Sequence, residues 1–319
     1  MEFTNDSAKI IKAMVSKFDK CQPKQFSDKT FKNNLSKLLT ILYNDINDGY
    51  NYVEKKSSSG CFKGRILKDI IKSNIYNSRF IPNDIKDYIE ENGHHQLEYS
   101  CPINKHDIRI RVLLFNNEKL DNLDHCIKYI YAWLFICYKY SDKNCADKLD
   151  IYLYLTPFKK NLPVRSTDIL DVENVNTALT LRCAPKGEII IFRSEEWMKV
   201  LIHETFHSFG LDLSQNAEKS LREKVKDLFP IQSDFAIAEA YSETWARIMN
   251  TAFTSYNSMK KKSNGDISEF ILYTTFSLQT ERLFALEQMN KVLGFMGLNY
   301  DVLCGDNDID AYLRKNLYR

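Results

Sequence analysis

The chain has 319 residues, of which 44% are hydrophobic and 27% are charged, and it contains few glycines and prolines. This composition excludes disordered and fibrous classes, and the length allows a buried core without stabilisation by disulfides or metal. The 44 basic and 42 acidic residues leave a net charge of +2, so we expect no binding to nucleic acid or to anionic lipid.

The first 95 residues are predicted to form a helical N-terminal region. Apolar residues recur there at helical spacing, and a serine- and glycine-rich stretch interrupts them. The predicted segments are two helices within Asp6–Asn47, a loop at Lys55–Gly64, and helices at Arg65–Asn77 and Pro82–Glu91.

After Gly93 the pattern indicates β-strands. Apolar and polar residues alternate over His106–Phe115 and again around Leu149–Leu155. Between these strands, Asp121–Tyr140 is predicted to be helical, and its apolar run is about half the length that a membrane span needs. Further short strands are expected at Thr177–Leu181 and Glu188–Phe192. We therefore expect a small mixed sheet within residues 105–193.

A helix is predicted next, over residues 194–210. Ser194 suits the N-cap position, acidic residues follow it in the first turn, and Gly210 can end the helix. From residue 214 to 319 the chain is expected to be almost entirely helical. The predicted helices there are Asn216–Phe229, Asp234–Ser258, Ile267–Val292 and a short one after Asp308. The predicted fold is thus α+β, with a helical region at 1–95 and a second domain at 96–319.

Eight cysteines are scattered through the chain without a CxxC pair. Residues 1–17 also lack the uninterrupted apolar stretch of a secretory signal. We therefore expect reduced thiols and a cytoplasmic location.

The helix at 194–210 contains the sequence His203-Glu204-Thr205-Phe206-His207. Two histidines four residues apart project from one face of a helix, close enough to bind one zinc ion. The glutamate beside the first histidine can reach a water on that metal and accept its proton. This pattern predicts metal-assisted hydrolysis, with Glu204 as the general base.

A catalytic zinc usually has three protein ligands, so a third must lie elsewhere. The candidate is Glu239, on the second predicted helix after the motif. Glu243 lies one turn further along and can accept a hydrogen bond from the outer nitrogen of a ligand histidine.

A His-Glu-x-x-His motif followed by Glu-x-x-x-acid on a later helix resembles the gluzincin metallopeptidases, the thermolysin-like branch of the zincins. The resemblance implies that His203, His207 and Glu239 hold one Zn²⁺ ion, that Glu204 is the base, and that Glu243 orients a ligand histidine. The family usually has an aspartate where this chain has Glu243, which leaves the contact of this longer side chain open.

The resemblance covers about residues 105–260 and implies a zincin-like sheet. The run Ile189–Asp212 also resembles uncharacterised metallopeptidase-like proteins of large DNA viruses, and for a viral chain the expected cytoplasmic location is the host cytoplasm or the virion. In a zincin the edge strand of the sheet binds extended substrate by backbone hydrogen bonds. The strand directly before the motif helix is expected to be that edge: Glu188, Ile189, Ile190, Ile191 and Phe192.

Asp212 is an alternative third ligand. Gly210 stands where a metzincin-type motif requires glycine, but the last position of that motif is Leu213, and Asp212 lies one residue early. Three tyrosines are candidates for stabilising an oxyanion, and the sequence does not choose among Tyr241, Tyr256 and Tyr273.

The expected function is zinc-dependent hydrolysis of peptide bonds, with a peptide or protein as substrate. The alternative is a non-catalytic binding or structural protein with the zincin fold. The intact Glu204 argues against that alternative, because a scaffold would need the histidines but not the base. The sequence indicates neither substrate specificity nor oligomeric state.

Overall fold

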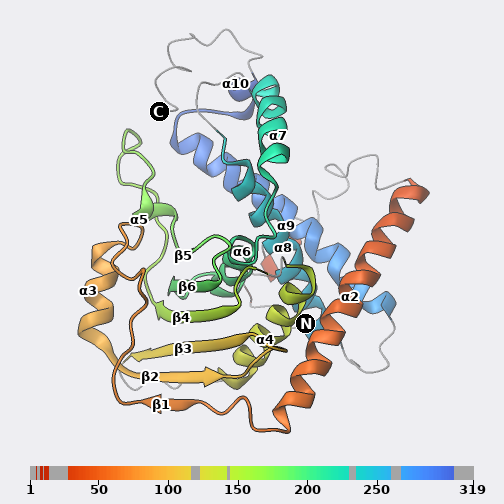
Figure 1. Cartoon of the computed structure of the whole chain (residues 1–319). Coiled ribbons are helices and arrows are strands. Elements are labelled where there is room, and N and C mark those ends of the chain that lie inside the picture. The colour runs from red at the N-terminus through yellow and green to blue at the C-terminus, as the bar shows by residue number, and fades with distance from the viewer. Residues whose placement is uncertain are drawn as a thin grey trace. The chain divides into compact units, whose positions relative to one another are not determined.

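A computed structural model describes residues 28–115, 123–141, 144–229, 235–259 and 267–304, together with Asn5, Ala8, Lys9, Ile11, Lys12 and Ala13. Within these residues the fold is α+β, as predicted, with one six-stranded mixed sheet and a helical C-terminal half (Figure 1). No described helix is long and apolar enough to cross a membrane.

The strands are β1 (Arg65–Leu67), β2 (Gly93–Ser100), β3 (Asp107–Phe115), β4 (Lys148–Thr156), β5 (Ala178–Thr180) and β6 (Lys186–Arg193). The helices are α2 (Lys29–Ser57), α3 (Asn83–Asn92), α4 (Leu123–Tyr140), α5 (Val172–Val175), α6 (Trp197–Ser208), α7 (Gln215–Leu228), α8 (Ile237–Ser258), α9 (Ile267–Phe295) and α10 (Tyr300–Cys304). The helix predicted after Asp308 and most of the one predicted near the N-terminus lie outside the described residues.

The chain forms two compact units. The sheet unit comprises Ile46–Leu213 and Tyr241–Ala246, and the helical unit comprises Met1–Asp45, Ser214–Ala240 and Arg247–Arg319. The predicted boundary at residue 95 differs from this division, because it falls inside β2, which pairs with β1 before it and β3 after it. The first 95 residues therefore contribute strands to the sheet as well as helices.

The strand order in the sheet is β1-β2-β3-β4-β6-β5. The pairs β3/β4 and β4/β6 are parallel, and the other pairs are antiparallel. The prediction of an edge strand before the motif helix is wrong, because β5 pairs with the outer side of β6 through the register Ala178↔Ile191 and Thr180↔Ile189. The residues thus placed in an interior strand are Glu188, Ile189, Ile190, Ile191 and Phe192.

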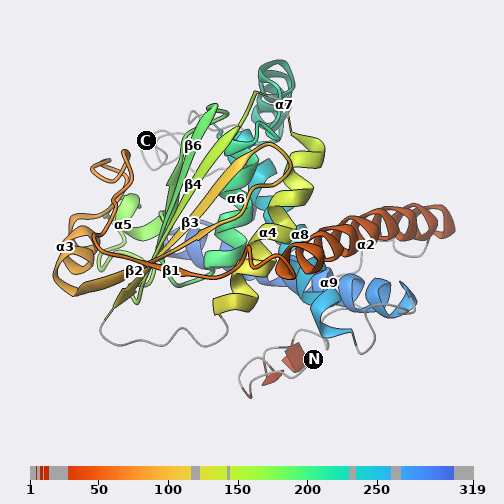
Figure 2. The same ribbon diagram turned by 60° about the horizontal axis from the view of Figure 1, so that its bottom comes forward.

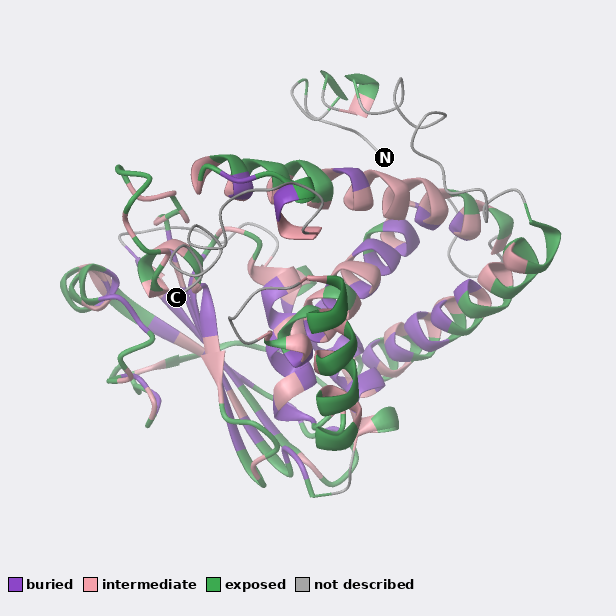
Figure 3. Ribbon diagram, turned by 90° about the horizontal axis from the view of Figure 1, so that it is seen from above, coloured by how far each residue is buried: buried purple, intermediate pink, exposed green. Residues whose placement is uncertain are grey.

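The two faces of the sheet are covered by different helices. Figure 2 shows α4 and α6 on one face and α3 on the other. Ile85 and Ile89 of α3 belong to a buried cluster that also contains Tyr154, Ile190 and Phe192. Buried residues run along the strands (Figure 3), as expected for a sheet covered on both faces.

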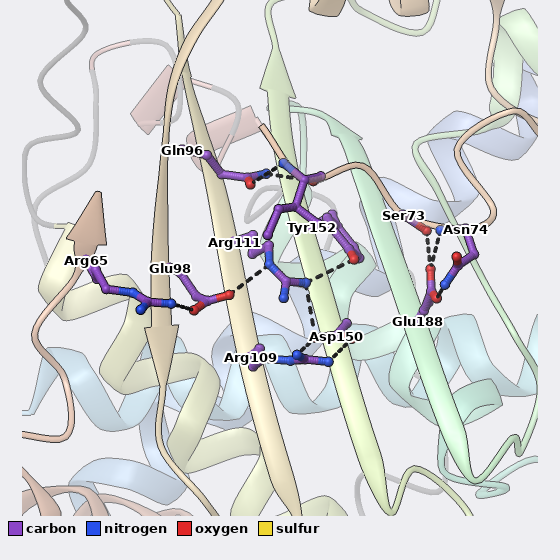
Figure 4. A network of polar contacts seen from close by, with 11 residues as sticks. Arg65, Ser73, Asn74, Gln96, Glu98, Arg109, Arg111, Asp150, Tyr152 and Glu188 are labelled. Atoms are coloured by element: carbon purple, nitrogen blue, oxygen red, sulfur yellow. Dashed lines mark hydrogen bonds and ion pairs between the residues drawn. The ribbon is translucent and has the colours of Figure 1, made fainter. Parts of the chain in front are cut away.

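The prediction of a helix at Arg65–Asn77 is wrong. Residues 65–67 form β1, and the chain from there to α3 is irregular and is held on the sheet by side chains (Figure 4). Gln96 accepts a hydrogen bond from the Ile71 N–H (2.9 Å) and donates to the Ile71 carbonyl (3.1 Å). The Glu188 carboxylate accepts from Ser73 and Asn74. The bonds to the Ile71 backbone and from the Asn74 N–H satisfy backbone groups that a helix would have paired internally.

Beside this segment, the same face of the sheet carries an ion-pair network centred on Arg111 (Figure 4). The buried Arg111 guanidinium donates to Glu98 (3.0 Å), Asp150 (3.1 Å) and the Tyr152 hydroxyl (2.9 Å). Asp150 also accepts two 2.6 Å bonds from Arg109. Because every charge in the network has an opposite partner, burial of Arg111 is compensated. The polar residues that alternate along β3 therefore hold the sheet together.

Candidate metal centre

The motif helix α6 is shorter than predicted. It begins at Trp197, because residues 194–196 form a turn in which Glu196 has a left-handed backbone (φ +55°). The Ser194 N–H donates to the Thr156 carbonyl (2.9 Å) and so ties this turn to the end of β4 instead of capping the helix.

The end of α6 confirms the role predicted for Gly210. Its φ is +62°, and its N–H donates to the His207 carbonyl (3.2 Å). The Leu211 N–H reaches back to the Phe206 carbonyl (2.9 Å). This pair of bonds is the Schellman arrangement that closes a helix with a left-handed residue.

The buried side of α6 is fixed by α4 and α8. The Trp133 indole N–H of α4 donates to the Thr205 hydroxyl (2.8 Å), and both groups are buried. Phe206 stacks on Trp133 and on Trp245 of α8, with centroid separations of 6.3 Å. These contacts set the rotation of α6, and His203 and His207 lie on its half-buried side.

The two histidine rings turn the same nitrogen toward one another. The Nε2 atoms of His203 and His207 are 3.1 Å apart. The Nδ1 atom of His207 lies 3.0 Å from Asp212 Oδ2, and that of His203 lies 3.5 Å from Glu243 Oε2. A carboxylate facing Nδ1 favours the tautomer that carries its proton there, which leaves a lone pair on Nε2. Both lone pairs then point into one small space.

Glu239 in the first turn of α8 completes a group of three. One ligand atom from each of His203, His207 and Glu239 lies within 4.8 Å of the others. In a tetrahedral zinc site with bonds of 2.0–2.1 Å, ligand atoms are about 3.3 Å apart. The 3.1 Å between the two ring nitrogens fits this geometry. The donor set of two imidazoles and one carboxylate is one that catalytic zinc takes in proteins.

Asp212 lies behind His207, on the nitrogen that faces away from His203. Its carboxylate accepts from the buried Ser242 hydroxyl (2.8 Å) and pairs with the Arg182 guanidinium (3.2 Å). Burial acts to raise the pKa of Asp212, but the hydrogen bond and charge of His207, with Ser242 and Arg182, outweigh it and lower that pKa. This position favours orientation of His207 over the alternative role as third ligand.

Glu243 divides its carboxylate between two partners. Oε1 accepts from the Lys199 ammonium (2.8 Å), and Oε2 faces His203 Nδ1 at 3.5 Å, which is long for a hydrogen bond. Its side chain is 32% exposed, against 3% for Asp212. The structure therefore places Glu243 next to a candidate ligand, as the sequence suggested, but in a looser contact than that of Asp212.

Glu204 is 8% exposed and lies next to His203 on α6. Of the three candidate tyrosines, Tyr241 lies nearest the motif in the described contacts, with its ring 6.3 Å from Phe206. Tyr256 is buried against Tyr43, and the Tyr273 hydroxyl donates to Glu269 (2.9 Å) within the same helix.

The sequence did not predict several of the residues that lie around the histidines. Lys199, Ser242 and Arg182 reach the two carboxylates from an earlier turn of α6, from α8 and from the β5–β6 connection. A disulfide joins Cys145 and Cys183, which corrects the expectation of reduced thiols at these two positions. No spacing in the chain signals these contacts, since the partners of the carboxylates come from separate elements.

Comparison with known proteins gave no match to a family model, to a curated protein or to a solved structure.

Proposed function

We propose that this protein is a zinc-dependent peptidase in which His203, His207 and Glu239 hold one Zn²⁺ ion. The observation that carries the proposal is the 3.1 Å approach of the two Nε2 atoms, with a carboxylate facing the opposite nitrogen of each ring. Two lone pairs that face one another repel, and either a cation or a proton on one of the two nitrogens removes this repulsion. A third donor, Glu239, within 4.8 Å favours a metal ion over a shared proton.

When bound by His203, His207 and Glu239, zinc would supply a Lewis acid that polarises a substrate carbonyl and lowers the pKa of a water molecule. Glu204 would accept the proton of that water as it attacks the carbonyl carbon and would deliver the proton to the leaving nitrogen. Tyr241 is the candidate to donate a hydrogen bond to the oxyanion that forms. Glu204 is 8% exposed, and this shielding from bulk water favours the role, because electrostatic and proton-transfer interactions are stronger where water is excluded.

An extended peptide is the substrate that suits the sheet best. Within the described residues β5 has a neighbouring strand on one side only, and that neighbour is β6, the strand that leads into α6. The outer edge of such a strand offers backbone N–H and C=O groups to a peptide. The proposed binding edge is therefore Ala178–Thr180, in place of β6.

The test is the substitution Glu204→Gln, which keeps the size of the side chain but removes the proton acceptor. Zinc content and melting temperature should stay at wild-type values, whereas hydrolysis of a fluorogenic peptide library should fall by about 10²–10⁴-fold. Glu223→Gln, an exposed glutamate of α7, is the matched control and should retain full activity. Wild-type protein that binds zinc but cleaves no peptide would support the alternative, a non-catalytic zinc-binding scaffold.

A further inference from the structure

The Cys145–Cys183 disulfide lies directly against the end of the motif helix. A Cβ atom added at Gly210 would lie 3.0 Å from the Cys145 sulfur and 3.5 Å from the Cys183 sulfur. Cys183 belongs to the connection between β5 and β6, residues 181–185, which we call the β5–β6 turn. The disulfide thus fastens this turn to the chain that precedes β4, beside the last turn of α6.

The β5–β6 turn also reaches His207 by two non-covalent contacts. The Cys183 N–H donates to the His207 carbonyl (3.0 Å), which also accepts from the Gly210 N–H at the end of α6 (3.2 Å). The neighbouring Arg182 guanidinium lies 3.2 Å from Asp212 Oδ2, the same oxygen that faces His207 Nδ1 at 3.0 Å. The turn therefore contacts both the backbone of His207 and the carboxylate that orients its ring.

Two residues at the disulfide have backbone conformations that are unfavourable for residues with a Cβ atom. Cys183 has φ +41°, and Ala146, next to Cys145, has φ +50°. Residues with a Cβ atom rarely adopt such angles unless the surrounding structure imposes them. The Ala146 N–H donates to the Ala184 carbonyl (2.8 Å), so the disulfide and this bond together hold the two strained positions. Loss of the disulfide would remove one of the two constraints.

We propose that the Cys145–Cys183 disulfide, acting through the β5–β6 turn and Arg182, positions His207 for metal binding, so that its reduction weakens the metal site. This inference rests on the proposed function of His203, His207 and Glu239. Cys183 is an exposed residue and Cys145 is buried, so a dithiol reductant approaches at Cys183.

The redox step is a two-electron exchange with a dithiol. One thiolate of the reductant attacks the Cys183 sulfur and breaks the S–S bond, and Cys145 leaves as a thiolate that takes up a proton. The second thiol of the reductant then displaces Cys183 from the mixed disulfide. The products are two cysteine thiols on this chain and one disulfide on the reductant, so electrons and protons balance.

The test compares zinc affinity in the oxidised and reduced protein by competition with a chromogenic chelator. Reduction uses a phosphine, because dithiols themselves bind zinc, and non-reducing peptide mapping reports the state of Cys145 and Cys183. We expect affinity to fall by about fivefold or more on reduction, the lower end of typical coupling between two sites. The double variant Cys145→Ser/Cys183→Ser should show the weaker affinity and no response to the phosphine. Cys61→Ser, which removes a free cysteine of the sheet unit, is the matched control and should respond like wild type.

A second series keeps the disulfide intact and so remains informative if the reduced protein unfolds. Arg182→Gln should lower zinc affinity, and Arg182→Lys, which keeps the charge near Asp212, should restore part of it. Thermodynamic reciprocity adds a third measurement, since zinc must make the disulfide harder to reduce by the same factor. A tenfold factor corresponds to a potential about 30 mV more negative.

The outcomes separate the two proposals. Equal zinc affinity in the oxidised and reduced proteins, or in wild type and Arg182→Gln, overturns the positioning role and leaves the peptidase proposal intact. Peptide mapping that finds Cys145 and Cys183 as thiols after mild oxidation also overturns it. Failure of the oxidised wild type to bind zinc at all overturns the proposed function itself.

Discussion

Each of the two histidines has a carboxylate near its Nδ1 atom, and the two contacts differ in length and in burial. Asp212 is buried, accepts from Ser242 and Arg182, and lies 3.0 Å from His207 Nδ1. Glu243 is more exposed, shares its carboxylate with Lys199, and lies 3.5 Å from His203 Nδ1. Because exposed ionic contacts contribute less than buried ones with several partners, Asp212 should contribute more to the metal site than Glu243.

We therefore predict an order of zinc affinities. Asp212→Ala should weaken zinc binding by about 10- to 100-fold, the usual loss when such a partner is removed. Glu243→Ala should weaken it by a smaller factor, and Glu243→Gln should be milder still, since its amide oxygen can accept a hydrogen bond. Chelator competition measures all three variants. If Glu243→Ala binds zinc as tightly as wild type, Glu243 has no part in the site, and a larger loss in Glu243→Ala than in Asp212→Ala would reverse the assignment.

At the scale of single elements, the end of α6 depends on Gly210 for two separate reasons. Its φ of +62° is costly for a residue with a Cβ atom, and that Cβ would be only 3.0 Å from the Cys145 sulfur. We expect Gly210→Ala to reduce the free energy of unfolding by about 1–2 kcal/mol from the backbone alone, with a further loss from the close contact.

Two other glycines allow these contributions to be separated by chemical denaturation. Gly60 has φ +75° and nothing within 4 Å of an added Cβ, so Gly60→Ala should show the backbone cost alone. Gly294 lies in α9 with open space around it and no left-handed φ. Gly294→Ala should therefore stabilise the protein by about 0.5–1 kcal/mol. Equal losses in Gly210→Ala and Gly60→Ala would show that the contact with Cys145 costs nothing.

Elements with a strong local pattern were predictable, and those that depend on distant partners were not. The alternation in β3 and β4 and the apolar spacing of α4, α8 and α9 mark these elements within a few residues of their bounds. The segment after β1 carries an apolar spacing typical of a helix, but Gln96 and Glu188 from other strands supply its hydrogen bonds. The place of β6 inside the sheet depends on pairing with β5, which no feature of β6 itself reveals.

The same contrast holds within the candidate site. His203 and His207 were predictable because residues four apart lie on one face of a helix, and Glu204 was predictable as the residue beside His203 in the motif. The approach of Glu239 to the two histidines was predictable, because a zinc site would need a third ligand and Glu239 lies on a later helix. The contact of Asp212 with His207 Nδ1, by contrast, was not predictable. It depends on the turn at Gly210 that closes α6, and the sequence alone suggested Asp212 as a ligand.

At the scale of the whole molecule, the candidate metal centre connects parts of the chain that are far apart in sequence, since His203 and His207 belong to α6 and Glu239 to α8. An ion that binds these three side chains only when the chain is folded must stabilise the folded state by mass action. The unfolded chain has no preformed site, so little of this stabilisation is lost to binding there.

We therefore predict that zinc raises the melting temperature of the metal-free protein, and that the rise depends on zinc concentration. At a free zinc concentration 100 times the Kd, the added stability should be about 2.7 kcal/mol. His207→Ala should abolish most of this response, because it removes one ligand and leaves the contact between Asp212 and Arg182 in place. His125→Ala, on α4 and outside the group of three, should respond like wild type. Differential scanning fluorimetry with buffered zinc measures the response, and an equal rise in wild type and His207→Ala would mean that the stabilising ion binds elsewhere.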